Sequence, residues 1–238
     1  SLGISHGALD HIKGKKLLKL LNYKSTSIFY ILYILVGLSV ILLWLMFSKI
    51  LLFTFLVVAS YHFGKEDAEF INSKSNLELV YFFKGSLVIT APLLFHKTET
   101  LNIFNNLNFD ISQSLLISNE FLYAFILISL FSNVVISMNK KIDIKSLLLM
   151  DFISILLLNY FLNPILAFTV YFCFLHSIRH SFKLSNELNK KNFIKGLKEF
   201  LIKAIPLTIL TAILFLISLF ILNNYYFLDN AISKVIFI

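Results

Sequence analysis

The stretch 26–47, TSIFYILYILVGLSVILLWLMF, decides the fold of this chain, because it contains no charged residue over its whole length. A transmembrane helix needs about 20 consecutive apolar residues to cross the hydrocarbon core of a bilayer. Comparable apolar runs recur along the rest of the 238 residues. We predict the further spans at residues 49–63, 77–95, 119–138, 146–162, 165–180 and 200–222.

The composition agrees with a membrane protein. Hydrophobic residues make up 58% of the chain and charged residues 14%, and the mean hydropathy is +0.83. A soluble domain has about 45–50% apolar and about 25% charged residues. The apolar runs are too continuous for the alternating pattern of a transmembrane barrel. We therefore predict an all-α, polytopic integral membrane helical bundle of about seven to eight spans, with residues 1–238 in a single membrane-embedded domain.

The net charge of +8 fits membrane topology better than nucleic-acid binding. Nearly all the loop lysines lie in alternate connections, at residues 12–25, 64–76, 139–145 and 181–199. The intervening connections at 48–49, 96–118 and 163–164 carry only Lys49 and Lys97. Because cytoplasmic loops are enriched in lysine and arginine, the first set is assigned to the cytoplasm. We expect a multi-pass protein of the cell (inner) membrane that is surrounded by the lipid bilayer and has no nucleic-acid partner.

The histidines suggest a metal site. His176 and His180 end the run YFCFLHSIRH (171–180), and residues four apart share one face of a helix. The predicted topology places His96 about 30 Å away, on the other side of the membrane. It brings the other five histidines to the cytoplasmic ends of the spans, namely His6, His11, His62, His176 and His180. Imidazole is the commonest metal ligand, and the single cysteine, Cys173, excludes a thiolate cluster.

The spacing of His6 and His11 allows only one of them to face such an ion, unless the helix breaks between them at Gly7. They are five residues apart, about 140° around a helix, and the spacing does not decide between them. Carboxylates four residues after a histidine can accept its second ring N–H and fix its tautomer. Asp10 follows His6 in this way, and Glu66 follows His62. The alternative interpretation, which is equally simple, is that the acidic residues here lie in loops and are solvated. These are Asp10, Glu66 and Asp67.

Two charges fall inside predicted spans, Lys84 and Asp151. Charges within a membrane are costly and are usually paired or functional. Because the two lie at similar depth in the predicted topology, we expect them to form a structural ion pair. Arg179 faces away from its neighbouring histidines, and the sequence leaves open whether it binds a lipid phosphate or Asp10.

Three motifs carry a family resemblance: HGALDH at 6–11, YHFG at 61–64 and HSIRH at 176–180. In this order on a polytopic chain they resemble the Brp/Blh family of membrane β-carotene 15,15′-dioxygenases, which are associated with bacterial and archaeal rhodopsins. The resemblance covers most of the chain, and HGALDH is its most specific part. Family members commonly carry a helix ahead of this motif, so the resemblance implies that residues are missing before Ser1.

The resemblance implies a catalytic domain with a non-haem Fe(II) site formed by four histidines: His6, His62, His176 and His180. His11 would then have an outer or structural role, beside Asp10 and Glu66. The implied reaction is the O2-dependent cleavage of the central 15,15′ double bond of β-carotene to two all-trans-retinal, which would pass to a microbial rhodopsin. Aromatic residues that flank these motifs are candidates for lining the polyene site, although 26 phenylalanines put an aromatic near any point. They are Tyr61, Phe63, Tyr171, Phe172 and Phe174.

Other functions stay open at this stage. Six histidines with one close pair do not match the histidine boxes of di-iron desaturases, and no H-E-x-x-H motif of a zinc protease is present. A bis-histidine haem or quinone electron carrier would also use histidines near one membrane face. A carotenoid- or retinal-binding membrane protein without catalysis is the third alternative.

Overall fold

The computed structural model describes residues 10–23, 27–70, 78–138 and 140–223, and these form helices joined by short connections, with no strand among them. Within these described ranges, six helices are long and apolar enough to cross a membrane. The all-α prediction is confirmed for the described residues, and the candidate spans agree with a multi-pass membrane protein. The count of about seven to eight spans is not confirmed.

The chain divides into two compact units. The first comprises Ser1–Leu51 and Ser181–Ile238, and the second is Leu52–His180. Two helices contribute to both units, α2 (Ser27–Phe70) and α8 (Ser177–Leu188).

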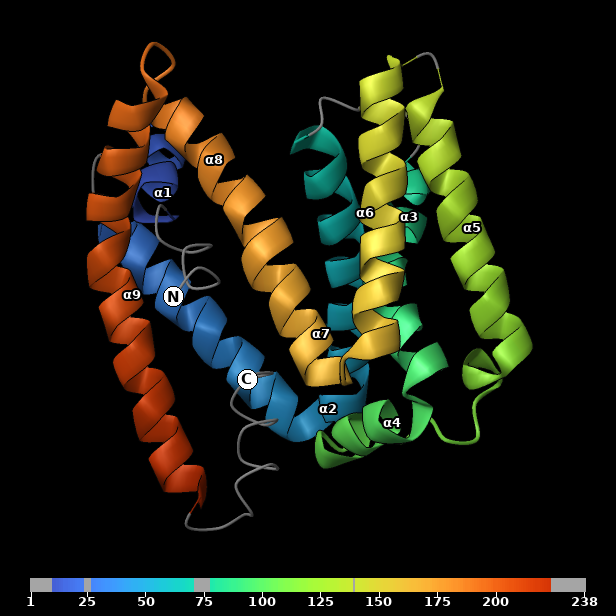
Figure 1. Ribbon diagram of the computed structural model, residues 1–238. Coiled ribbons are helices and arrows are strands. Elements are labelled where there is room, and N and C mark those ends of the chain that lie inside the picture. The colour runs from blue at the N-terminus through green and yellow to red at the C-terminus, as the bar shows by residue number, and fades with distance from the viewer. Residues whose placement is uncertain (1–9, 24–26, 71–77, 139, 224–238) are drawn as a thin grey trace. The chain divides into compact units, whose positions relative to one another are not determined.

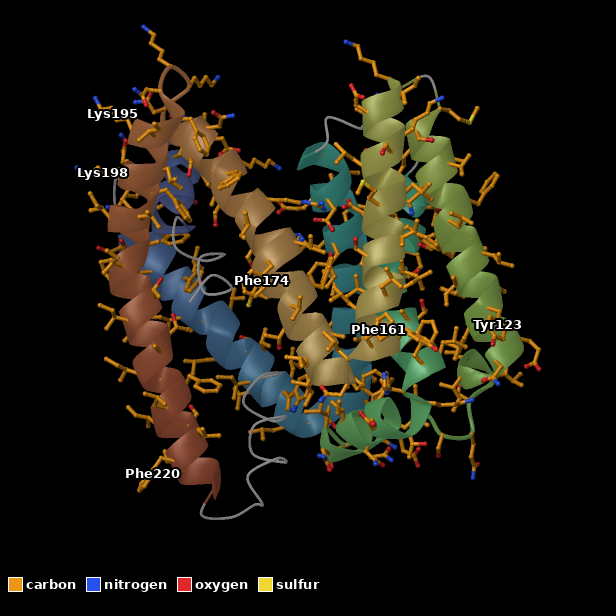
Figure 2. The ribbon with its side chains drawn as sticks, viewed as in Figure 1. Tyr123, Phe161, Phe174, Lys195, Lys198 and Phe220 are labelled. Carbon is orange, nitrogen blue, oxygen red and sulfur yellow. The ribbon has the colours of Figure 1, made fainter. Side chains whose placement is uncertain are left out.

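The first unit contains α1 (Asp10–Leu20), α9 (Phe193–Asn223) and parts of α2 and α8. Its small core contains Leu184 of α8 with Phe200 and Ala204 of α9. Lys195 and Lys198 mark one end of α9 and Phe220 marks the other (Figure 2). Because most of the apolar window of α9 is exposed, this helix has the surface expected for contact with lipid, with lysines at one end.

The second unit is a helical bundle. It contains the rest of α2 with α3 (Glu78–Phe95), α4 (Lys97–Asn106), α5 (Asn119–Ser137) and α6 (Ile142–Phe161). Figure 1 shows α3, α5 and α6 side by side, with α4 across one end. The remaining elements are the 3-10 helix η2 (Leu115–Ile117), α7 (Pro164–Val170) and the π-helix η3 (Tyr171–His176), which leads directly into α8. The largest core cluster joins α2, α3, α6 and η3 through residues that include Phe63, Leu87, Phe152 and Tyr171.

The long helix α2 is interrupted at Phe47, whose backbone angles of φ −136° and ψ 45° are not helical. The apolar runs 26–47 and 49–63 predict a connection at 48–49, so the break falls beside the predicted position. Each part of α2 is about 20 residues long, which is sufficient to cross a bilayer.

Two predicted connections are partly helical, and their predicted boundaries are wrong. Residues 64–70 continue α2 instead of starting a loop, and residues 181–188 continue α8. His62 and His180 therefore lie about two turns inside their helices. Hydropathy marks where a helix leaves an apolar environment, but a polar sequence can remain helical beyond that point. The extension of α2 keeps Glu66 and Asp67 on the same helix as His62.

Two glycines allow α2 and α3 to approach closely beside these residues. A Cβ on Gly64 would lie 1.9 Å from the carbonyl oxygen of Tyr81, and a Cβ on Gly85 would lie 1.9 Å from that of Ser60. Neither carbonyl is a flexible group that can move aside. Small residues at helix crossings let the backbones of membrane helices pack directly.

Gly85→Ala is expected to destabilise the protein, because the added methyl group forces α2 and α3 apart. Overpacking of this kind costs about 1–3 kcal/mol, and thermal unfolding in detergent would measure it. Gly37→Ala is the matched control, because a Cβ there meets nothing within 4 Å. That control is expected to be neutral or stabilising by up to about 1 kcal/mol. Equal stability of the two variants would contradict the close crossing.

Candidate metal centre

Two helical segments from distant parts of the sequence supply the polar residues of the site. His62, Glu66 and Asp67 come from α2, and His176 and His180 come from the end of η3 and from α8. Glu66 follows His62 by four residues and His180 follows His176 by four, so each pair shares one helix face. Tertiary packing then brings the two faces together.

The closest group of possible ligands is His62, Glu66 and His176. One ligand atom from each lies within 4.8 Å of the other two, and the ring centroids of His62 and His176 are 5.4 Å apart. His180 joins this group through its Nδ1, which lies 2.6 Å from Oε2 of Glu66. The structure thus brings together three of the four histidines predicted as ligands.

The described residues do not test the remaining predicted members of the site. His6 lies outside the described residues. Asp10 and His11 belong to α1 in the first unit, and their side chains are outside the described part of the structure.

The donor atoms present suit a ferrous ion. Nδ1 of His176 lies 3.1 Å from Oδ1 of Asp67, so Nε2 is the nitrogen with which His176 can bind a metal. His176 is fully buried and His180 nearly so, which gives both rings a fixed surrounding. Imidazole nitrogens are donors that suit iron, as they also suit zinc, copper and nickel.

Asp67 also belongs to this cluster, although no motif in the sequence predicts it. It is only 3% exposed, and it contacts three side chains of the second helical segment. Besides His176, the hydroxyl of Tyr171 donates to its Oδ2 over 2.8 Å, and Arg179 lies 3.7 Å from its Oδ1. The interpretation of Asp67 as a solvated loop charge is therefore wrong. A prediction that α2 continues as a helix beyond Gly64 would have placed Asp67 on a helix face instead of in a loop.

The predicted ion pair between Lys84 and Asp151 is also wrong. Asp151 instead accepts two hydrogen bonds from the guanidinium of Arg179, with distances of 2.9 and 2.5 Å. Lys84 is buried in α3, and its positive charge acts on Asp67. Similar depth in the membrane did not identify the partner of Asp151, because depth does not determine which sides of two helices are in contact. Arg179 accordingly binds carboxylates of the bundle.

The aromatic residues predicted to line the substrate site have different environments. Phe63 packs edge-on against His176 with ring centroids 4.8 Å apart, and Phe172 stacks on the same ring at 5.8 Å. Tyr171 is 2% exposed and packs in the core. Tyr61 donates a hydrogen bond to Glu78 of α3. Phe174 is 59% exposed.

His96 is remote from the cluster, as the sequence analysis expects. It follows the last residue of α3, whereas the contact of Tyr61 with Glu78 puts the first residue of α3 beside the site. The intervening 18 residues of α3 extend roughly 27 Å. The nearest acidic partner of His96 is Glu99, at 3.8 Å.

Comparison with known protein families identifies the chain. The family model described as beta-carotene 15,15'-dioxygenase matches residues 1–238, which confirms the resemblance to the Brp/Blh family. Comparison with curated proteins and with solved structures gave no match. Because this family model matches its whole length, the chain belongs to the beta-carotene 15,15'-dioxygenase family.

Proposed function

We propose that this protein cleaves the central 15,15′ double bond of β-carotene with O2, at a non-haem Fe(II) ion held by four histidines: His6, His62, His176 and His180. The carbon–carbon double bond breaks and each of its two carbons becomes an aldehyde, which consumes one O2 and releases two all-trans-retinal. The observation that supports this most is the approach of His62, Glu66 and His176 to within 4.8 Å of one another in a chain of this family.

The protein side chains hold and orient the metal ligands. Iron, when bound, would supply the binding and activation of O2. Neutral imidazoles bind it without cancelling its positive charge. Glu66 lies 2.6 Å from Nδ1 of His180 and can accept a hydrogen from it, so Nε2 would be the nitrogen of His180 that holds the metal.

The membrane setting suits an apolar substrate. β-Carotene dissolves in the bilayer, and exposed apolar helix surfaces such as that around Phe174 would meet it there. Phe172 is half-buried and stacks on His176, so it is the best placed of the predicted aromatics to contact both the site and a polyene. Tyr171 and Phe63 are buried and are better suited to support the ligands. By the distribution of loop lysines, we assign the site to the cytoplasmic side of the cell membrane, from which retinal would pass to a rhodopsin.

One purified sample tests this proposal. The protein in detergent is expected to contain about one iron per chain and to release retinal from added β-carotene only when O2 is present. Metal analysis, absorption spectroscopy and chromatography of the products would be run together. A Soret band would indicate a haem carrier instead, and bound β-carotene without aldehyde would indicate a carotenoid-binding protein.

Glu66→Gln is expected to weaken iron retention by about 10- to 100-fold, because the His180 ring loses its charged acceptor. Chelator competition against Fe(II) would measure the change. The matched control is Glu187→Gln, an exposed carboxylate on α8, which is expected to retain wild-type iron binding. Iron loss as complete as that caused by removing a histidine would make Glu66 a direct ligand and contradict its proposed outer role.

A further inference from the structure

The π-helical turn η3 brings Tyr171 and His176 to the same carboxylate. They are the first and last residues of this turn, five positions apart. An α-helix would place such residues about 140° apart around its axis, whereas i→i+5 bonding brings them closer to one face. Their rings are 6.1 Å apart with planes inclined by 29°, and both polar groups reach Asp67.

The two oxygens of Asp67 have different partners. Oδ2 accepts the hydroxyl hydrogen of Tyr171 over 2.8 Å. Oδ1 lies 3.1 Å from Nδ1 of His176 and 3.7 Å from the guanidinium of Arg179. With both oxygens engaged, the carboxylate cannot rotate without losing a contact. The ring of His176 is therefore held by a group that is itself fixed.

The charges around Asp67 compensate one another. Asp67 and Asp151 carry two negative charges, and Arg179 and Lys84 carry two positive charges. Such compensation lowers the cost of burying ionised groups inside a membrane bundle. An ionised carboxylate in this position is a strong acceptor for an N–H donor.

We propose that Asp67 is a positioning residue of the metal centre. It keeps the hydrogen of His176 on Nδ1 and thereby directs the lone pair of Nε2 toward the metal, while Tyr171 and Arg179 hold the carboxylate in place. The importance of Asp67 for the reaction rests on the proposed function, because His176 is a metal ligand only in that proposal. The orientation of the His176 ring exists in the metal-free protein and can be tested there.

Asp67→Asn is the direct test, because it preserves the shape of the side chain and removes its charge. The metal-free protein, labelled with 15N-histidine, would be examined by NMR in micelles at mildly alkaline pH. The wild type is expected to show an N–H correlation at Nδ1 of His176, assigned by its loss in His176→Gln. In Asp67→Asn this correlation is expected to weaken or disappear, and Fe(II) affinity is expected to fall about 10- to 100-fold.

A second variant covers the case in which Asp67→Asn fails to fold. Tyr171→Phe keeps the ring in its core position and removes only the hydrogen bond to Oδ2. Tyr171→Phe is expected to weaken the Nδ1 correlation of His176 and to lower the Fe(II) affinity, each by less than Asp67→Asn does. Asp143→Asn, an exposed carboxylate in the first turn of α6, is the matched control and is expected to change neither.

The outcomes separate this inference from the proposed function. An unchanged Nδ1 correlation in both variants would overturn the positioning role, even if their thermal stability fell. A wild type that shows the Nδ1 correlation but binds no iron and releases no retinal would support the orientation of His176 and reject the iron-dependent function.

Discussion

His176→Ala is expected to abolish both iron retention and retinal formation. The ring of His176 is fully buried and lies beside His62 and Glu66, so the substitution removes one of the nitrogen donors at the centre of this group. Removing even a supporting residue of a metal ligand lowers affinity or activity by about 10- to 100-fold, and loss of a ligand is expected to exceed that range. Iron content and retinal yield of the purified variant would be compared with the wild type.

His96→Ala is the matched control for this experiment. It removes an imidazole from the same bundle at roughly 27 Å along α3 from the site and is expected to retain iron and activity. The same loss as in His176→Ala is expected for His6→Ala, a residue outside the described structure, and for His62→Ala and His180→Ala. Loss of iron in His96→Ala, or full iron content in His176→Ala, would contradict the proposed centre.

Asp151→Asn is expected to destabilise the protein by about 3–5 kcal/mol, the typical cost of removing one partner from a buried ion pair. Arg179 donates two hydrogen bonds to Asp151, and both side chains are largely buried. The substitution leaves the guanidinium with Asp67 at 3.7 Å as its remaining acidic neighbour. The free energy of unfolding in mixed micelles would measure the effect.

A double variant shows whether the destabilisation comes from breaking the ion pair or from any substitution at this position in the bundle. Asp151→Leu combined with Arg179→Met removes both charges, and replacing a buried pair with apolar residues is often neutral or stabilising. The double variant is therefore expected to be more stable than Asp151→Asn alone. Asp143→Asn, which changes an exposed carboxylate of the same helix, is expected to be near neutral. If Asp151→Asn were also near neutral, the pair would not contribute to stability.

The sequence predicted the residues that lie inside spans better than it predicted where helices end. Runs such as 26–47 can be recognised as spans from the sequence alone, because a helix needs about 20 apolar residues to cross a membrane. The continuation of α2 to Phe70 was missed, because polar residues after Gly64 look like a loop when only hydropathy is considered. This error concealed Asp67, whose burial depends on a helix that extends beyond the apolar run.

The candidate site shows the same division. The four-residue spacing of His176 and His180 predicts a shared face, and the structure places His62 beside them as the motifs implied. The pairing of Lys84 with Asp151 was wrong because helix rotation, and not depth, selects the partner. The π-helical turn at Tyr171 also has no simple signal in the sequence, since five-residue spacing is uninformative for an α-helix.

The amino-acid sequence by itself determined the membrane class, the positions of most spans and the family, because these depend on local hydropathy and on short motifs. Only the tertiary structure decided which carboxylate meets which histidine and which cation meets Asp151. The histidine–carboxylate contacts join residues 109 and 114 positions apart, and the Arg179–Asp151 pair joins residues 28 positions apart. All of them depend on the rotation and close approach of helices. Backbone contacts at Gly64 and Gly85 set that approach, and it follows from packing between helices rather than from the pattern within any one of them.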